Sequence, residues 1–208
     1  MFTGIVEELG HVVSREGSRI VVRCPVAASD TAIGDSLSID GVCLTVVGLE
    51  GDEASFDISQ ETFDRTSLGS LGPDDRVNVE RPATLVSRLG GHLVQGHVDG
   101  VALATAVQPD AEGGARLSVR LPADLRRYVV EKGSITLDGV SLTVAAVRGD
   151  EIDVALIPHT RVATTLGVIH TGDPMNVEVD VVAKYVARNI ESLMSDGVAV
   201  EPGKERTA

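Results

Sequence analysis

The sequence predicts an all-β fold of two tandem, internally duplicated small closed β-barrels of Greek-key type, followed by a C-terminal amphipathic helix. Three observations predict it. Residues 36–69 recur as residues 134–167 without a gap, the segments between turn signals are short and rich in β-branched residues, and residues 181–197 show a helical apolar repeat. The length of 208 residues also suits two domains of about a hundred residues each.

The internal repeat is the strongest of these signals. DGVCLTV at 40–46 recurs as DGVSLTV at 138–144, and NVE at 78–80 recurs at 176–178. Each copy is much longer than the ~20–50 residues of a solenoid repeat, so each is expected to bury its own core. We therefore predict a first barrel over 1–90, a second barrel over 91–180, and a helix with a tail over 181–208, with the boundary in ERPATLVSRLGG.

The elements of the first copy follow from local composition. Short near-alternating segments bounded by Asp-Gly, Gly-Asp and Gly-Pro predict strands at 19–24, 36–40, 42–50 and 54–59. So many short strands indicate a small closed barrel. Residues 60–69, which end in Gly, and residues 122–133, which begin with Pro and end in Gly, each predict a short helix or turn.

The C-terminal segment differs from both copies. Apolar residues recur there every three or four positions, and Gly197 ends the pattern; they are Val182, Val186, Ile190, Leu193 and Met194. This spacing predicts an amphipathic helix that buries its apolar stripe either on another subunit or on its own barrel, and the pattern favours neither. Residues 201–208 are expected to be a frayed tail.

Composition excludes several classes of protein. The net charge of −13 opposes a phosphate backbone, and three Phe, two Tyr and no Trp are too few to stack bases, so no nucleic-acid partner is expected. No apolar run is long enough to span a membrane, and Glu7 and Glu8 stand where a signal peptide would be basic. Together with only two cysteines, expected as free thiols, this predicts a cytoplasmic protein.

The common catalytic signatures are absent. The sequence has no P-loop, dinucleotide fingerprint, nucleophile elbow, HExxH or CxxC motif. His92 and His97 are the nearest histidine pair, but a separation of five predicts opposite faces of a strand, and no Cys or carboxylate completes a ligand set. No metal site is expected.

The residues left for chemistry are small polar groups present in both copies, which could ring a pocket mouth and bind a polar heterocycle. They are Thr3-Gly4, Gly96-His97, Cys43, Thr45, Ser141, Thr143, Thr62 and Thr160. Taken singly, such residues are usually strand formers, caps or core groups. The copies differ where His97 replaces Ile5 and where Asp180 follows Val179, so His97 and Asp180 are candidate reactive groups.

At MFTGIVEELG, DGVCLTV, GGHLVQGHVDG, DGVSLTV and IPHT…TTLG, the sequence resembles the riboflavin synthase family of the alpha type, which has two lumazine-binding repeats. The resemblance runs from Met1 to the C-terminal helix. It implies dismutation of two 6,7-dimethyl-8-ribityllumazine molecules, with transfer of a four-carbon unit, to give riboflavin and 5-amino-6-ribitylamino-pyrimidinedione. It also implies no cofactor, no metal, and a homotrimer whose active sites form between barrels of neighbouring subunits; a lumazine synthase partner is left open.

The resemblance carries over site residues position by position. It implies chemistry at Phe2, Cys43, His97, Ser141, Thr143 and Asp180. It implies substrate contacts in the first barrel at Gly4, Ile5, Val6, Cys43, Leu44, Thr45, Asp57, Ile58, Ser59, Gln60, Glu61 and Thr62. In the second barrel it implies Gly96, His97, Val98, Lys132, Ser141, Leu142, Thr143, Ala155, Leu156, Ile157, Pro158, His159 and Thr160. Gln60 and His159 depart from the Lys and Glu often found at these positions, which puts contacts to the ribityl chain in doubt.

The reaction needs a proton removed from the 7-methyl group of one lumazine and a nucleophile added at C7 of the other. Holding both rings in contact can supply roughly 7–11 kcal/mol of the barrier. We expect His97 with Ser141 or Thr143 to move the proton, and leave open whether Asp180 or Cys43 supplies a nucleophile or positions water. The main alternative is a non-catalytic, antenna-type lumazine- or flavin-binding protein of the same fold; a flavin-reductase module would need a dinucleotide domain that the chain lacks.

Overall fold

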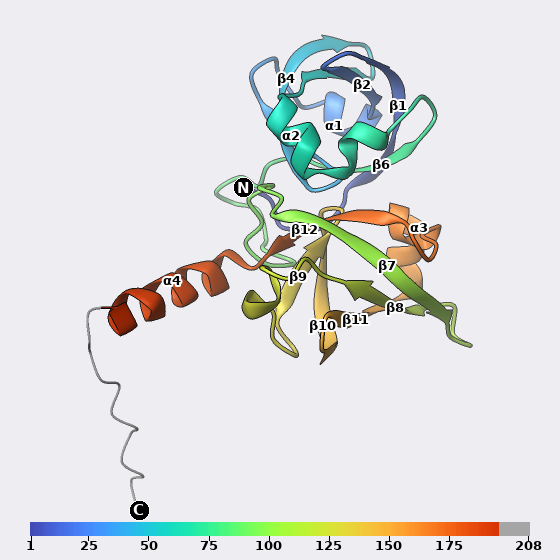
Figure 1. The fold of residues 1–208 in the computed structure, drawn as a ribbon. Helices are drawn as coiled ribbons and strands as arrows, with labels where there is room; N and C mark the ends of the chain where they lie inside the picture. Colours follow the sequence, from blue (N-terminus) through green and yellow to red (C-terminus); the bar gives the residue numbers. More distant parts are fainter. Residues whose placement is uncertain (196–208) are drawn as a thin grey trace, which may run out of the picture.

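The computed structural model describes residues 1–195, which form two closed six-stranded antiparallel barrels and a projecting helix (Figure 1). In the first barrel the strands lie in the order β1-β2-β5-β4-β3-β6, and β6 pairs with β1 to close it. These strands are β1 (Glu8–Glu16), β2 (Arg19–Arg23), β3 (Ser36–Ile39), β4 (Val42–Glu50), β5 (Glu53–Asp57) and β6 (Arg76–Glu80).

The second barrel repeats this arrangement, in the order β10-β11-β8-β7-β12-β9. Its strands are β7 (Gly100–Pro109), β8 (Ala115–Arg120), β9 (Ser134–Leu137), β10 (Val140–Arg148), β11 (Glu151–Leu156) and β12 (Pro174–Val179). The two copies match in detail, because the β4–β5 register shifts between Val46 and Gly48 and the β10–β11 register shifts between Val144 and Ala146. The prediction of an all-β duplicated double barrel is confirmed.

Short helices lie in the loops, including the segments 60–69 and 122–133 where the sequence predicts a short helix or turn; the helices at 25–28 and 158–167 were not predicted. The loops hold α1 (Pro25–Ala28), α2 (Gln60–Arg65), η1 (Ser67–Ser70), η2 (Arg126–Tyr128), α3 (Pro158–Ala163) and η3 (Thr165–Gly167). The Ser59 side chain caps α2 by accepting a hydrogen bond from the Thr62 amide at 3.1 Å. Pro158 begins α3, where its missing N–H costs nothing.

Each barrel has its own aliphatic core, but the cores also receive one residue each from the other repeat. Ile20, Leu37 and Phe56 are fully buried in the first barrel, and their neighbours in the second are equally apolar. Val6, which precedes β1, packs on the core of the second barrel. Val98, which precedes β7, packs on the core of the first. The segment that leads into each barrel therefore lies against the other one.

The barrels meet along a buried polar seam with approximate two-fold symmetry. Each Asn side chain, at 78 and 176, donates from Nδ2 to the backbone oxygen of the Asp in the opposite barrel, Asp138 and Asp40, at 2.9 Å. Each Asp in turn accepts at 2.7 Å from the amide of the Asn in its own barrel. The backbones touch at Gly41, where a Cβ would lie 2.6 Å from the Gly139 nitrogen, so this approach requires glycine.

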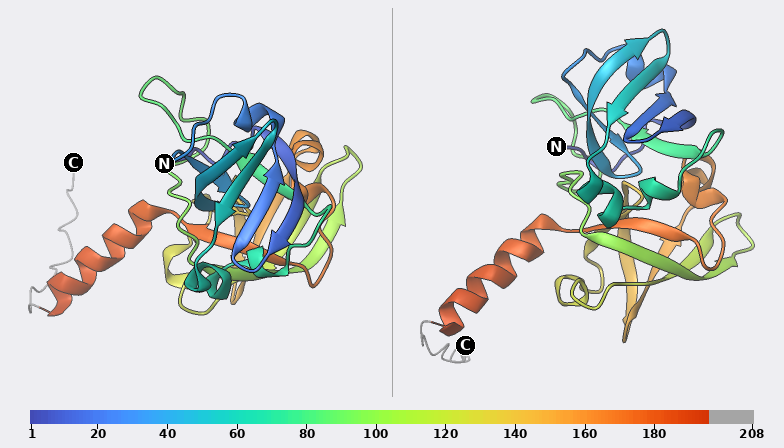
Figure 2. Two further views of the ribbon diagram at one scale, coloured as in Figure 1. Left: turned by 90° about the horizontal axis from the view of Figure 1, so that it is seen from above. Right: turned by 45° about the horizontal axis from the view of Figure 1, so that its top comes forward.

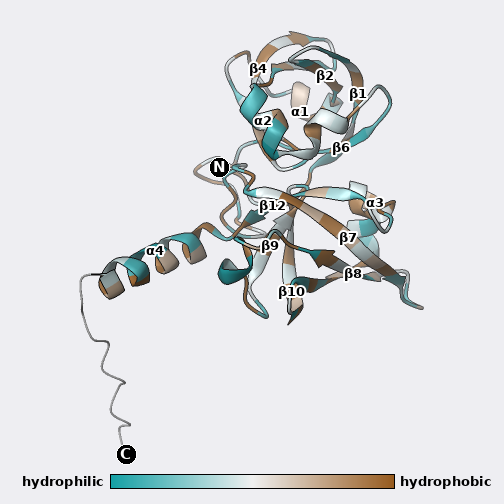
Figure 3. Ribbon diagram, in the orientation of Figure 1, coloured by the Kyte–Doolittle hydropathy of each residue, from teal (hydrophilic) through white to brown (hydrophobic). Residues whose placement is uncertain are grey.

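Helix α4 (Val181–Ser195) leaves the second barrel and projects away from both barrels (Figures 1 and 2). Its apolar stripe is about half exposed on this chain, and the hydropathy colouring shows apolar turns along it (Figure 3). The stripe comprises Val182, Val186, Ile190, Leu193 and Met194. The helix is confirmed, and its stripe is not buried on the chain's own barrels; the expectations for Gly197 and for 201–208 lie outside the described residues.

Two ion pairs connect α4 to the second barrel. Lys184 Nζ lies 2.7 Å from Asp99 Oδ1 at its base, and Arg127 of η2 pairs with Glu191 at 2.5 Å further along. Within residues 1–195, no helix is long and apolar enough to cross a membrane.

Candidate active site

The segment before β1 lies against the second barrel and the segment before β7 lies against the first; we call these the exchanged segments. They create two related half-sites at the seam. The Gly4 oxygen accepts a hydrogen bond from the Ser141 amide at 2.8 Å, and the Gly96 oxygen accepts one from the Cys43 amide at 2.9 Å. The substrate contacts that the resemblance implies are therefore not grouped by repeat: each half-site combines residues of both repeats. Gly4–Val6 lies with Ser141–Thr143, and Gly96–Val98 lies with Cys43–Thr45.

The histidine beside Ser141 is His92, which the sequence analysis considered only as a metal ligand. His92 Nδ1 lies 2.7 Å from Ser141 Oγ, and the side chain is 9% exposed. Burial lowers the pKa of the His92 imidazole below its ordinary value, and the negative charge of Asp180 opposes this shift. A neutral imidazole with its proton on Nε2 accepts a hydrogen bond from the Ser141 hydroxyl, so in this tautomer the pair has the arrangement of a base-assisted hydroxyl.

Glycine before His92 makes this contact possible. A Cβ at Gly91 would lie 2.2 Å from the Thr3 oxygen and 2.7 Å from Ser141 Oγ. Residues 92–97 also do not form a strand: the only pairing in this stretch is an isolated bridge between Phe2 and Val94. The expected placement of the two histidines on opposite faces of one strand is therefore wrong.

His97 lies in the other half-site. Its side chain is exposed and has no hydrogen bond within the described chain, while its backbone follows Gly96 beside Cys43. The expected pairing of His97 with Ser141 is not seen in this chain, because the exchanged segments place the two residues in different half-sites. Phe2 is 1% exposed, and a Cβ at Gly96 would lie 3.0 Å from its ring. The Phe2 ring therefore packs against the Gly96 backbone.

The remaining implied contacts occupy matching positions in the two barrels. Thr45 and Thr143 are exposed on β4 and β10, one residue before Val46 and Val144, which pair with β5 and β11. The runs 57–62 and 155–160 continue from the ends of β5 and β11 into α2 and α3. Thr45 and Thr143 thus stand beside the first residues of these two runs. The Asp57 carboxylate is engaged by Arg19 at 2.9 and 3.0 Å.

Lys132 has a positive φ at a position where the first copy has glycine. Its φ is +66°, and its counterpart in the first copy is Gly34, with φ +99°. Both amides make the same bond, from Lys132 to the Val144 oxygen and from Gly34 to the Val46 oxygen, each at 2.8 Å. A non-glycine residue in this conformation costs about 1–2 kcal/mol, so the lysine side chain is retained where glycine would fit better.

Asp180 connects the site to α4. Its Oδ1 accepts a hydrogen bond from the Val182 amide at 2.9 Å, and its backbone oxygen accepts from Ala183 at 3.0 Å. It therefore caps the N-terminus of α4, and its charge acts on the His92 imidazole. No group of three or more His, Cys, Asp or Glu side chains that could hold a metal occurs in residues 1–195.

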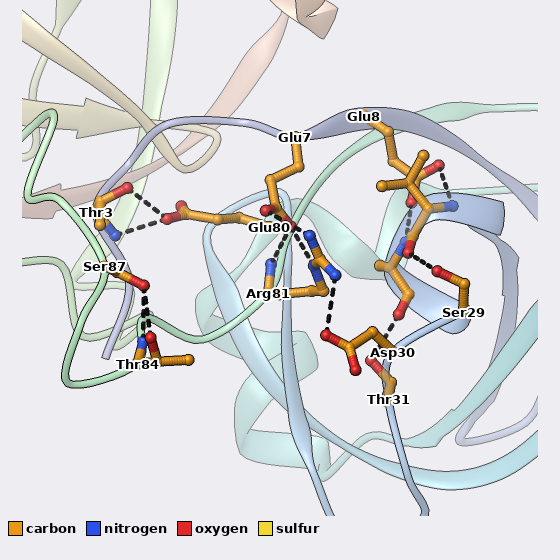
Figure 4. Close-up of polar contacts among 12 residues, drawn as sticks. Thr3, Glu7, Glu8, Ser29, Asp30, Thr31, Glu80, Arg81, Thr84 and Ser87 are labelled. Carbon is orange, nitrogen blue, oxygen red and sulfur yellow. Dashed lines mark hydrogen bonds and ion pairs between the residues drawn. The ribbon is translucent and has the colours of Figure 1, made fainter.

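A cavity of about 630 Å³ lies between the first barrel and the linker that follows β6. Its wall is held by Arg81, which pairs with Glu7 at 2.8 Å and Asp30 at 3.3 Å (Figure 4). Of the implied substrate contacts only Ile5 lines this cavity, so the half-sites do not coincide with it.

Comparison with known proteins identifies the class. The lumazine binding domain family matches residues 3–82 and again residues 95–180, so the fold is that of a tandem lumazine-binding protein. LumP complexed with riboflavin is similar in structure, with a TM-score of 0.80, 27% identity, and coverage of 86% of this chain and 99% of LumP. LumP complexed with 6,7-dimethyl-8-(1'-D-ribityl) lumazine gives 0.77 and 26%, with the same coverage.

Sequence relatives narrow the class further. Riboflavin synthase of Mycobacterium tuberculosis is 50% identical over 200 residues, which cover 92% of this chain and 99% of the relative. Riboflavin synthase of Photobacterium phosphoreum is 41% identical over 194 residues, covering 90% and 88%. The chain belongs to the riboflavin synthase family.

Proposed function

We propose that this protein is a riboflavin synthase, which converts two 6,7-dimethyl-8-ribityllumazine molecules into riboflavin and 5-amino-6-ribitylamino-pyrimidinedione. The family membership supports the reaction, and the contact between His92 and Ser141 is the observation that carries its chemistry. The atoms of two lumazines equal those of the two products, so the transfer of a four-carbon unit needs no oxidant, reductant or cofactor.

In the proposed mechanism the half-site of Ser141 removes the proton from the 7-methyl group. His92 takes the hydroxyl proton as Ser141 Oγ takes a proton from the 7-methyl group of one lumazine. The positive charge of Lys132 and the hydroxyl of Thr143 stabilise the resulting anion, and the anion forms a carbon–carbon bond to the second lumazine. That second lumazine is held in the half-site of Cys43 of a neighbouring subunit, where His97 exchanges protons with this second lumazine and Cys43 is a candidate nucleophile for its C7.

We also propose that the active protein is a homotrimer. The exposed stripe of α4 supports this, because an amphipathic helix with no partner on its own chain is stabilised by burying that stripe on other copies. The exposure of His97 and Thr143 supports a catalytic site completed by the barrel of a neighbouring subunit. The two free cysteines, of which Cys24 is buried, agree with a cytoplasmic protein.

Incubation of the purified protein with the lumazine alone tests the proposal. A riboflavin synthase forms free riboflavin over many turnovers, seen as the appearance of flavin absorbance. A non-catalytic binding protein, the alternative of the same fold, binds the lumazine and leaves it unchanged, which would overturn the proposal.

A further inference from the structure

Glu80, at the end of β6, is a buried carboxylate that accepts hydrogen bonds from the start of the chain, as its counterpart Glu178 accepts them from the amides of residues 95–97. Glu80 is 5% exposed and accepts three hydrogen bonds from two consecutive residues, of which Figure 4 shows the two from Thr3. The Thr3 amide and Thr3 Oγ1 each donate to Oε1 at 2.7 Å, and the Gly4 amide donates to Oε2 at 3.0 Å. The carboxylate therefore fixes the backbone of Thr3 and Gly4.

The same two residues hold both members of the proton-transfer pair through their oxygens. The Thr3 oxygen accepts from the His92 amide at 3.2 Å, and the Gly4 oxygen accepts from the Ser141 amide at 2.8 Å. His92 comes from the linker and Ser141 from β10, so no local structure holds them together. The Thr3–Gly4 backbone is their common support.

We propose that Glu80 is the positioning residue of the His92–Ser141 pair: its carboxylate fixes Thr3–Gly4, whose oxygens fix the histidine and the serine. The inference rests on the proposed function. Glu80 is in none of the sets of substrate contacts named above. It acts on the distance between His92 and Ser141 and does not contact the substrate.

The charge state of Glu80 matters to this role. An ionised carboxylate only accepts hydrogen bonds, which suits three converging donors. Burial raises the pKa of Glu80, and the bonds from Thr3 and Gly4 oppose that rise. Glutamine in its place keeps one oxygen but turns an NH₂ group toward an N–H donor, so at least one bond is lost.

Glu8 provides a matched control. Its carboxylate also accepts two backbone hydrogen bonds, from Val26 at 3.1 Å and Ala27 at 2.6 Å, but these lie at the start of α1, away from His92 and Ser141. Glu80→Gln is expected to lower kcat at least about tenfold with KM changed less than about threefold, since removal of a working acid–base pair costs about 10²–10⁴-fold. Glu8→Gln is expected to keep kcat within about twofold of the wild type.

A double-mutant cycle separates positioning from general destabilisation. In a Ser141→Ala background the pair no longer exists, so Glu80→Gln should change the residual kcat less than about twofold. An equal loss in both backgrounds, or a kcat within about twofold of the wild type for Glu80→Gln alone, would overturn the inference. If Glu80→Gln does not fold, Thr3→Val, which removes the Oγ1 donor to Glu80 and the Oγ1 acceptor of the Ile5 amide, should lower kcat about threefold, and Ser141→Ala should abolish that effect.

An NMR titration of His92 provides a readout that does not depend on turnover. In Glu80→Gln the His92 pKa should rise toward its ordinary value as the imidazole loses its buried position, while Glu8→Gln should leave it unchanged. An unchanged His92 pKa in Glu80→Gln would contradict the inference. A wild-type protein that forms no riboflavin would contradict the proposed function instead, and the titration would still decide the inference.

Discussion

The buried Asp40–Asp138 pair at the seam predicts that the protein becomes more stable as the pH falls from neutral toward mildly acidic. Burial raises the pKa of Asp138 from 3.8 to about 7, and burial together with the charge of Asp138 raises the pKa of Asp40 well above its ordinary value. The ionised form is the penalised one, so these carboxyls weaken folding as pH rises from about 4 to about 7. For Asp138 alone the full penalty above pH 7 is about 4 kcal/mol.

Asp138→Asn removes this penalty with little change in geometry. The variant keeps an Oδ1 to accept from the Asn176 amide, at 2.7 Å in the wild type, and Asn tolerates the positive φ of 45° at this position. The variant should be more stable than the wild type at about pH 8, and should lack the gain of about 2 kcal/mol that Asp138 gives the wild type between about pH 8 and about pH 5.5.

Urea denaturation at fixed protein concentration measures both quantities. Asp74→Asn is the control, because Asp74 is an exposed acid that also has a positive φ, of 70°. It should leave the stability of the protein at either pH within about 0.5 kcal/mol. A destabilised Asp138→Asn at about pH 8, or one that keeps the wild-type pH dependence, would refute the reasoning.

The remaining predictions concern the site and the assembly. His97→Ala should lower turnover about 10²–10⁴-fold, while riboflavin affinity, followed by fluorescence titration, changes less than about tenfold. If turnover and affinity fall by the same factor, His97 is a binding contact only. Lys132→Gly should raise the melting temperature, since about 1–2 kcal/mol of backbone strain is relieved, yet lower kcat, because the charge that stabilises the anion is lost; a lowered melting temperature would argue against that strain. Truncation after Asp180 should convert trimers to monomers with both barrels folded, and sedimentation that still shows a trimer would contradict assembly through α4.

The duplicated barrel was predictable because repeats and turn signals are local properties. DGVCLTV and DGVSLTV occupy matching positions, in the turns that lead into β4 and β10 and in the first half of those strands, and Ser59 begins the helix expected at 60–69. The apolar spacing of α4 likewise predicted its helix. The boundaries at 90 and 180 stay a prediction.

The grouping of the site was not predictable, because it depends on contacts between remote segments. Nothing in the periodicity of residues 2–6 indicates that they lie on the second barrel, beside Ser141. His92 was missed for the same reason: as an isolated histidine its usual role is structural. Two glycines before it, of which Gly91 leaves no room for a Cβ, were the one signal in the sequence that a close approach occurs there.

The ratio of lumazine consumed to riboflavin formed tests the central claim most directly. The purified protein is incubated with the lumazine and a chelator, with nothing else added, and substrate and both products are quantified by chromatography. Two interacting half-sites that transfer a four-carbon unit between two lumazines predict two lumazines consumed for each riboflavin, with one pyrimidinedione formed. A ratio of one, or a yield that requires an added nicotinamide or metal, would contradict the account.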